Sequence, residues 1–233
     1  MRYQAALRPD SASIIKRGAV SPDAAHCPNR VTAAVPLDRP WPSRVPGSRY
    51  NETFMDGLLY AAIAYIRSPV GIFVEELRRE LHPAHTHADA HITMLPPRAL
   101  HGSERQAMHL IAAVCHETTG FEITLGDVES FVPVTPTVFL RVARGAYRMR
   151  ELHDRMNHGV LQCVETWPYM PHLTILKADD DTEARKTLKL SRRRWAGYSD
   201  TRHVRIKSLT LVKGSGERWV DVATWPLGDA AIR

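Results

Sequence analysis

The chain has 233 residues and a mass of 26.2 kDa, which is enough for one sizeable domain or for two small lobes that share a core. Hydrophobic side chains make up 44% and charged side chains 24%, which excludes collagen-like, wholly disordered and coiled-coil classes. The longest apolar run, residues 58–66, is far shorter than the ~20 residues that cross a membrane. The widely spaced Cys27, Cys115 and Cys163 indicate neither a disulfide scaffold nor a zinc knuckle, so we expect a reduced, cytoplasmic setting.

The formal charge of +6 belongs mainly to the N-terminal segment. Residues 1–50 hold eight Lys and Arg against three Asp, whereas the rest of the chain carries 23 basic and 22 acidic side chains. The same segment contains seven of the 16 prolines and shows neither helical nor strand periodicity. We therefore interpret residues 1–54 as a disordered or loosely attached basic, Pro-rich tail, and residues 55–233 as the folded domain.

Two explanations of this tail stay open. It is either a basic arm that attracts phosphates or a non-native segment upstream of a true start at Met55. Deleting residues 1–54 separates the two, because unchanged activity and salt dependence would exclude a role for the arm.

In chain order, the first half of the domain shows alternating strand and helix patterns. Residues 58–66 form an apolar, β-prone run that predicts a buried strand, and apolar residues at helical spacing predict a helix over 70–81. A short strand over 91–95 should end at Pro96-Pro97. A capping box between Ser103 and Gln106 should begin a second helix that ends near Gly120.

The second half repeats the pattern. Extended segments are predicted over 121–131 and 137–142, then a helix over 149–156 and a strand over 172–177. A further helix should begin at the acids 179–181 and end at the bases 192–194, as the helix dipole favours. The last elements are predicted as a hairpin of strands 204–212 and 219–225, joined through Gly214-Ser215-Gly216. The absence of a strict βαβ rhythm indicates an α+β fold with largely antiparallel sheets.

Two of these strands carry the same His-x-Thr tripeptide. His91-Ile92-Thr93 and His172-Leu173-Thr174 lie 81 residues apart, and each is followed by a helix. Because side chains alternate along a strand, His and Thr of each motif share one face, with Cα atoms about 6.6 Å apart. An imidazole and a hydroxyl at that spacing can reach one tetrahedral phosphate together.

The tripeptide alone is weak evidence, since short motifs also occur by chance. His116-Glu117-Thr118 matches it as well, and His101-Gly102-Ser103 is a serine variant. Both fall at predicted helix ends or in loops, so we treat them as decoys. The evidence for a functional role is that the tripeptides at 91–93 and 172–174 both lie in apolar, strand-like runs and that the same order of elements surrounds each of them.

With these motifs the sequence resembles the 2H phosphoesterase superfamily, the LigT-like or 2'-5' RNA ligase proteins, over roughly residues 57–225. The resemblance rests on AHITMLPP (90–97), FEITLGDVESFVPVTPTVFL (121–140) and YMPHLTIL (169–176). It implies a two-lobed, pseudo-symmetric α+β fold, with mostly antiparallel sheets lining a central cleft and helices outside. It also implies that His91, Thr93, His172 and Thr174 face each other across that cleft.

The resemblance further implies phosphodiester chemistry, usually on 2',3'-cyclic phosphates at RNA or nucleotide ends, with release of the 3' oxygen and a 2'-phosphate product. Some members of the family join RNA ends through a 2'-5' bond. Histidine can act as base or acid near neutral pH. We assign His172 as base and His91 as acid, although the near symmetry permits the reverse. The hydroxyls of Thr93 and Thr174 can stabilise charge on the non-bridging oxygens, so no metal or other cofactor is expected.

Other residues are weaker candidates. The crowded histidines 82, 85, 87 and 91 make a metal site conceivable, but a solvated loop explains them better. Tyr169 is a candidate for base stacking. The helix end at Arg192, Arg193 and Arg194 is a candidate for contact with a phosphate backbone. Cys115 lies on the apolar side of a helix and is expected in the core.

The sequence thus predicts a monomeric, metal-independent cyclic phosphodiesterase whose partners are RNA ends or nucleotide cyclic phosphates, with no membrane or protein partner. Two alternatives stay open. One is a catalytically weak RNA-binding protein that keeps the cleft for recognition. The other is a phosphodiesterase for a small non-RNA cyclic phosphate, such as an ADP-ribose derivative.

Overall fold

The computed structural model describes residues 58–83, 88–215 and 218–228, so the predicted tail over residues 1–54 lies outside the described residues. The described part holds eight strands, four α-helices and one 3-10 turn. Their order is β1 (Leu59–Tyr65), α1 (Pro69–Leu81), β2 (His91–Arg98), α2 (Glu104–His116), β3 (Phe121–Ser130), β4 (Thr137–Arg144), α3 (Ala146–Met156), η1 (Gly159–Leu161), β5 (His172–Lys177), α4 (Asp181–Ala196), β6 (His203–Ile206), β7 (Ser208–Ser215) and β8 (Arg218–Pro226).

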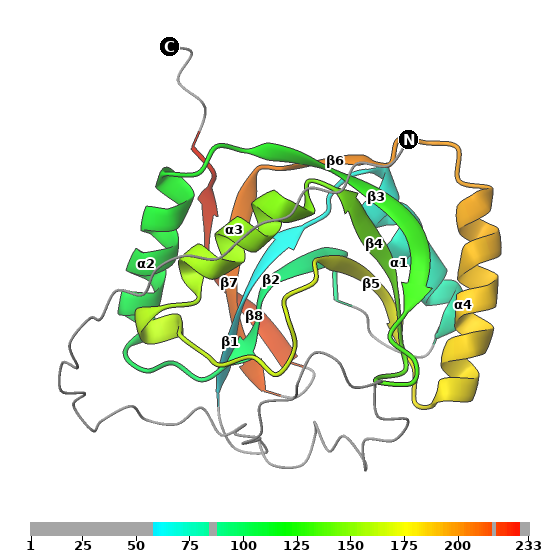
Figure 1. Cartoon of the computed structure of the whole chain (residues 1–233), viewed down its shortest axis with the longest axis horizontal. Coiled ribbons are helices and arrows are strands. Elements are labelled where there is room, and N and C mark those ends of the chain that lie inside the picture. Colours follow the sequence, from blue (N-terminus) through cyan, green and yellow to red (C-terminus); the bar gives the residue numbers. More distant parts are fainter. Residues whose placement is uncertain (1–57, 84–87, 216–217, 229–233) are drawn as a thin grey trace, which may run out of the picture.

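All eight strands belong to one curled sheet in the order β6-β3-β4-β5-β2-β1-β7-β8 (Figure 1). Every pair of neighbouring strands in it is antiparallel. The order divides the sheet into two four-stranded halves that meet where β2 lies beside β5. The α+β fold predicted from the sequence is confirmed, with two lobes of antiparallel strands and helices outside them.

The two lobes repeat one pattern. The succession β1-α1-β2-α2 in the first half of the chain recurs as β4-α3-β5-α4 in the second. Helices α1 and α4 lie together at the right of Figure 1, and α2 and α3 lie together at its left. Phe73 of α1 packs against Trp195 of α4 with ring centroids 5.6 Å apart, and Arg155 of α3 pairs with Glu117 after α2. Each helix pair therefore joins one helix from each half.

Local sequence signals explain the helix ends. The capping box before α2 is present, with Ser103 accepting from the backbone N–H of Gln106 and the Gln106 side chain accepting from the Ser103 N–H. Helix α4 begins after Asp180, whose carboxylate accepts from the N–H of Glu183. None of the helices in the described residues is long and apolar enough to span a membrane.

The predicted strand 204–212 is wrong as a single element. The structure divides it at Lys207 into β6, which pairs with β3 at one edge of the sheet, and β7, which pairs with β1 in the other lobe. The buried side chains change phase there, from Val204 and Ile206 to Leu209 and Leu211. One flat strand cannot bury both sets on the same face, because its side chains alternate with a period of two.

The strand over 91–95 also continues further than predicted, through Pro96-Pro97 to Arg98. Its register against β1 shifts here, since Leu95 is opposite Ala62 and Arg98 is opposite Tyr60. This is a bulge, where prolines are tolerated because their positions are not required to donate to the ladder. The tight turn predicted at residues 214–216 falls partly outside the described residues.

Candidate active site

The two His-x-Thr motifs lie on the central strands β2 and β5, where the lobes meet. Ile92 of β2 is the register partner of Leu173 of β5, and both side chains are fully buried in the core. They face the side of the sheet on which the helices pack. Because side chains alternate along strands, the His and Thr of each motif project from the opposite side, which we call the histidine face.

On the histidine face the four motif side chains are half-buried. In an antiparallel pair, the residue before Ile92 neighbours the residue after Leu173. His91 is therefore on the side of Thr174, and Thr93 on the side of His172, of the single register pair that joins the two strands. The structure brings together the four residues that the motif argument selected. Each imidazole and the threonine of the other lobe therefore flank the same register pair on the histidine face.

Both histidines are held by the same backbone contact. Nδ1 of His91 lies 2.7 Å from the carbonyl oxygen of Asp89, and Nδ1 of His172 lies 2.8 Å from that of Met170. A carbonyl oxygen only accepts, so Nδ1 carries the hydrogen of the neutral ring and donates it. In each ring Nε2 is then the nitrogen that can take up or release a proton.

The surroundings favour neutral imidazoles. Burial lowers the pKa of His91; its bond to Asp89 opposes this, while Arg78 and Lys177 lower the pKa further. Burial likewise lowers the pKa of His172; its bond to Met170 opposes this, while the charges of Lys177 and His91 lower the pKa further. The charge of His91 thus acts on His172, so the two rings lie within electrostatic reach of each other. A phosphate bound between the rings would raise the pKa of both imidazoles, because a nearby negative charge favours their protonated form.

The two histidines have different aromatic neighbours. The Tyr65 ring meets the His91 ring edge-on at 6.4 Å, and its hydroxyl donates to Asp221 over 2.6 Å. The His172 ring lies beside the packed pair Phe131 and Phe139, whose centroids are 5.1 and 5.0 Å from it and 4.2 Å from each other. His91 therefore has polar groups beside it, whereas His172 packs against a pair of phenyl rings. The motif search did not identify these aromatic neighbours.

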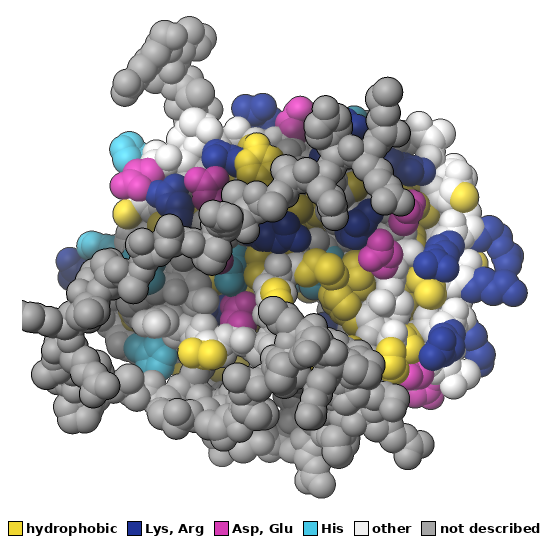
Figure 2. Space-filling model, in the orientation of Figure 1, with side chains coloured by type: hydrophobic (Ala, Val, Ile, Leu, Met, Phe, Trp, Pro, Cys, Tyr) yellow, Lys and Arg dark blue, Asp and Glu magenta, His cyan; other side chains and the backbone are white. Residues whose placement is uncertain are grey.

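The arginines at the end of α4 lie away from the histidine face. Helix α4 buries Ala184 and Trp195 in the core on the other side of the sheet, so its basic side chains project outward. Figure 2 shows dark blue side chains gathered over α4 at the right of the molecule. Arg192 donates to the Val128 carbonyl oxygen, Arg194 pairs with Glu80 at 3.0 Å, and Arg193 is exposed. The structure does not bring these three to the motif histidines.

A metal site is not visible in the described part of the chain, where no group of three or more His, Cys, Asp or Glu is placed to hold an ion. Of the crowded histidines, His85 and His87 lie outside the described residues, and His82 contacts Glu183 over 2.7 Å. Cys115 is fully buried, and burial raises the pKa of its thiol to about 12, in accord with a place in the core.

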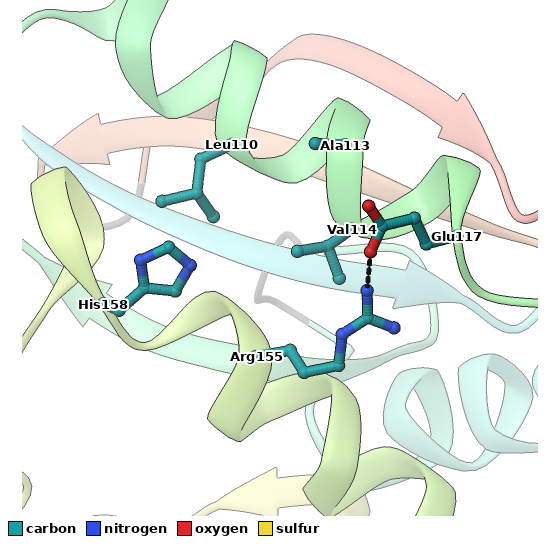
Figure 3. Close-up of a pocket in the computed structure, with 6 residues that line it drawn as sticks. All are labelled: Leu110, Ala113, Val114, Glu117, Arg155 and His158. Carbon is teal, nitrogen blue, oxygen red and sulfur yellow. Dashed lines mark hydrogen bonds and ion pairs between the residues drawn. The ribbon is translucent and has the colours of Figure 1, made fainter.

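A pocket of about 450 Å³ lies between α2 and α3 and is separate from the motifs (Figure 3). Leu110, Ala113 and Val114 of α2 line one side of it, and the ion pair between Arg155 and Glu117 crosses one end. Its lining includes none of the motif residues. We assign it no part in the chemistry.

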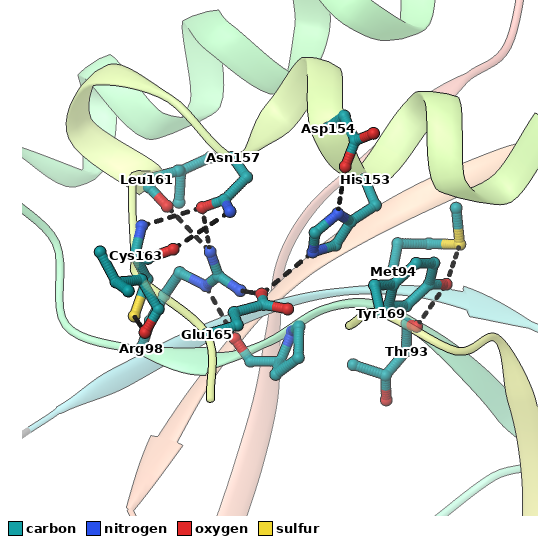
Figure 4. Close-up of polar contacts among 12 residues, drawn as sticks. Thr93, Met94, Arg98, His153, Asp154, Asn157, Leu161, Cys163, Glu165 and Tyr169 are labelled. Atoms are coloured by element: carbon teal, nitrogen blue, oxygen red, sulfur yellow. Dashed lines mark hydrogen bonds and ion pairs between the residues drawn. The ribbon is translucent and has the colours of Figure 1, made fainter. Parts of the chain in front are cut away.

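Tyr169 lies on the helix side of the junction between the lobes. Its hydroxyl donates to the carbonyl oxygen of Thr93 over 2.9 Å, and its ring stacks on His153 with centroids 4.3 Å apart (Figure 4). His153 contacts Glu165, which also pairs with Arg98. Tyr169 is therefore next to the motif of β2, but it contacts the strand backbone from the side opposite the histidines.

The fold and the twin motifs define a two-lobed α+β protein of the 2H phosphoesterase class. The family model described as "2'-5' RNA ligase superfamily" matches residues 66–218, which is more than half of the chain. The chain therefore belongs to the 2'-5' RNA ligase superfamily, as the motifs predicted.

Two relatives by sequence carry the name "Putative phosphoesterase". The one from Oceanobacillus iheyensis is 25% identical over 156 residues, covering 65% of this chain and 88% of its own length. The one from Bacillus cytotoxicus is 26% identical over 110 residues, covering 46% of this chain and 62% of its own length.

Two solved structures are similar in shape. Escherichia coli LigT complexed with phosphate aligns with a TM-score of 0.47 and 17% identity, covering 74% of this chain and 97% of LigT. The TT0787 protein of Thermus thermophilus aligns with a TM-score of 0.47 and 14% identity, over 74% of this chain and 98% of that protein.

Proposed function

We propose that the protein is a metal-independent phosphodiesterase that opens 2',3'-cyclic phosphates at RNA or nucleotide ends to 2'-phosphates. The observation that carries the proposal is the shared arrangement of His91 and His172. Both rings lie on one face of the sheet, both are held at Nδ1 by a backbone carbonyl, and both present Nε2 for proton transfer. The names of the two relatives agree with a phosphoesterase.

In the proposed reaction, Nε2 of His172 removes a proton from water while the water oxygen forms a bond to phosphorus. The bond from phosphorus to O3' breaks, and the proton on Nε2 of His91 passes to O3'. The product is a 2'-phosphate with a free 3' hydroxyl. Each positioned proton transfer contributes about 10²–10⁴ in rate. With a 5' hydroxyl of RNA in place of water, the same two proton transfers would open the cyclic phosphate and join the RNA ends through a 2'-5' bond.

The surroundings of the two rings support this division of roles. His172 packs against Phe131 and Phe139, and burial together with the charges of Lys177 and His91 disfavours its protonated form, as a base requires. The pKa of His91 is also lowered, by burial and by Arg78 and Lys177, but Asp89 opposes this lowering through its carbonyl and its carboxylate, and this contact favours His91 over His172 as the acid. The hydroxyls of Thr93 and Thr174 would donate to the non-bridging oxygens, where charge gathers in the transition state.

The test is hydrolysis of 2',3'-cyclic AMP by the full chain in the presence of EDTA, with 2'-AMP and 3'-AMP separated by chromatography. We expect 2'-AMP as product at the same rate with and without EDTA. Exclusive formation of 3'-AMP, or activity that EDTA abolishes, would contradict the proposed chemistry.

Two further substrates decide between the alternatives. Turnover of an RNA oligonucleotide ending in a cyclic phosphate supports an RNA-end substrate, whereas turnover only of a cyclic phosphate of ADP-ribose supports the small-molecule alternative. Binding of the oligonucleotide without turnover of any of the three substrates supports the RNA-binding alternative.

A further inference from the structure

The sheet is weakest where the two motifs meet. Strand β2 has five register partners on β1, yet within the described residues its pairing with β5 consists of Ile92 opposite Leu173 alone. Beyond this pair the two strands lack a continuous ladder. The backbone carbonyls of both motifs that point into the gap between β2 and β5 therefore need hydrogen-bond donors from other parts of the chain.

The carbonyl of Thr174 in β5 receives its donor from a buried arginine of α1. Arg78 is only 6% exposed, and its guanidinium donates to three carbonyl oxygens. Nη2 lies 2.6 Å from the Thr174 oxygen, Nε 3.2 Å from the Ile175 oxygen, and Nη1 2.6 Å from the Ala88 oxygen. One side chain thus ties the motif of β5 to the segment that leads into the motif of β2.

A second side chain of α1 supports the same segment. The carboxylate of Glu75 accepts from the backbone N–H of Ala90 over 2.8 Å, directly before His91. Helix α1 therefore holds the segment that leads into the motif of β2 through Glu75 and Arg78, and the motif of β5 through Arg78.

The carbonyl of Thr93 in β2 receives its donor from Tyr169. Its hydroxyl donates to the Thr93 carbonyl oxygen over 2.9 Å, so each motif threonine has its carbonyl bound by a side chain from outside its own strand. The Tyr169 ring is fixed by its stacking on His153, with planes 2° apart. A rigid aromatic side chain and a buried guanidinium thus each bind the carbonyl oxygen of the motif threonine in the other half.

We propose that Arg78 and Tyr169 are positioning residues that set the separation and orientation of the two His-x-Thr motifs. This inference rests on the proposed function, because it concerns the geometry of the same site. A side chain that fixes a strand backbone by its carbonyl fixes the neighbouring imidazole and hydroxyl with it. A misplacement of about 1 Å is enough to cost on the order of 10²-fold in rate.

Arg78 also carries a charge that Tyr169 lacks. The charged and titratable groups that face His91 are Asp89 in its own segment, Tyr65 of β1, Arg78 of α1, and Lys177 and His172 of β5. Among them Arg78 is a cation that lowers the pKa of His91. Removal of its charge should therefore raise that pKa, whereas loss of the Tyr169 hydroxyl should not change it.

The experiment compares the variants Tyr169→Phe, Arg78→Lys and Arg78→Gln with wild type. Steady-state kinetics with 2',3'-cyclic AMP give kcat and KM, and NMR titration of the imidazole Cε1–H gives the pKa of His91. Arg79→Gln is the matched control, because Arg79 is exposed and its Nε donates only to the Glu75 carbonyl in the same helix. We expect this control to match wild type.

We expect Tyr169→Phe to lower kcat about tenfold with little change in KM and no change in the pKa of His91. The phenyl ring is retained, so a mere stacking role would leave kcat intact. Arg78→Gln should lower kcat about 10²-fold and raise the pKa of His91. Arg78→Lys should lower kcat but keep that pKa, because its single ammonium keeps the charge without the three-way fork.

Wild-type kcat in Tyr169→Phe, or in Arg78→Lys, would overturn the inference even if Arg78→Gln failed to fold. An unchanged His91 pKa in folded Arg78→Gln would overturn the role of the charge. Failure of the proposed function is a separate result, which is recognised by the absence of turnover in the wild-type chain. That result would refute both the proposed function and the positioning roles of Arg78 and Tyr169.

Discussion

Nδ1 of His172 lies 2.8 Å from the carbonyl oxygen of Met170, two residues earlier in the chain. His91 has the same relationship to Asp89 at 2.7 Å. Two rings held in the same tautomer, one from each lobe, are what a paired acid and base need, because each then presents the same nitrogen to the substrate.

The first prediction concerns these two rings. Replacing His91 or His172 with Ala should lower hydrolysis of 2',3'-cyclic AMP by on the order of 10²–10⁴ each, because each removes one proton transfer. The fold should persist, since neither side chain belongs to the buried core. His116→Ala is the matched control, because His116 begins a third His-x-Thr tripeptide that the structure places, exposed, at the end of α2. Circular dichroism and initial rates measure both effects, and wild-type turnover in either motif variant would end the proposal.

The pH dependence gives a second prediction. Burial is the main cause that lowers the pKa of both His91 and His172 below the ordinary value of about 6.5. The base must be neutral and the acid protonated, and the pKa of both rings is lowered, so kcat/KM should follow a bell-shaped profile centred below pH 6.5. A pH–rate profile on 2',3'-cyclic AMP measures this. An acidic limb centred above pH 7 would contradict the environment described for these rings.

The threonines give a third prediction. Thr93→Val and Thr174→Val keep the shape of the side chain but remove the hydroxyl donor, so each should lower kcat by about 10²–10³ if it acts on the developing charge. The Ser variants retain the hydroxyl and should recover most of the activity. Comparable rates for the Val and Ser variants would show that the hydroxyls have no part in the chemistry.

Much of the site could be predicted from the sequence, because the motifs lie in strands with strict alternation. Ile92 and Leu173 mark the core side, so the histidines had to project from the other. What could not be predicted is how the motifs are supported. Arg78 is buried and ties the motif of β5 to the segment before the motif of β2, and its only signal is its place four residues after Val74, on the apolar face of α1. A charged residue on the apolar face of a helix predicts a buried hydrogen-bond partner, but the sequence does not identify that partner.

The strand order shows a similar limit. Apolar alternation predicted most elements near their observed bounds, but it contains no information on which strands pair. The phase change between Ile206 and Leu209 was visible in the sequence and marks where the chain passes from β6 to β7. That these consecutive strands lie in different lobes depends on their pairing with β3 and β1, which are distant in sequence.

The basic face of α4 gives a fourth prediction. Lys189 and Arg193 project outward, away from the histidine face, and neither has an ion-pair partner among the described residues. Replacing both with Gln should weaken binding of a single-stranded RNA oligonucleotide and lower the slope of log K against log salt by about 0.7 for each charge lost. Turnover of 2',3'-cyclic AMP should not change. Arg105→Gln, an exposed change on α2, is the control, and an equal loss on both substrates would exclude the proposed RNA contact.

The network behind Tyr169 determines the last prediction. Glu165 contacts Arg98, whose side chain is 1% exposed, and also His153 at 3.0 Å. Burial opposes ionisation of Glu165, but bonds from His153 and Arg98 outweigh it and lower its pKa, so its contribution to stability is lost as the pH falls through that lowered value. Burial also opposes protonation of His153, but bonds to Glu165 and Asp154 outweigh it and raise its pKa, so its contribution is lost as the pH rises through the raised value.

Both charges are therefore present together between the two pKa values, in the mildly acidic range. Glu165→Gln should lower the free energy of unfolding by roughly 2 kcal/mol there, because Arg98 and His153 lose a charged hydrogen-bond partner. The difference from wild type should shrink towards strongly acidic pH, where Glu165 is protonated, and partly towards alkaline pH, where His153 is neutral. Urea unfolding across this range measures the effect. Glu151→Gln, which removes an exposed i,i+3 partner of Arg148, should cost less than about 0.5 kcal/mol at every pH. Equal, pH-independent costs for the two variants would show that the buried network does not stabilise the fold.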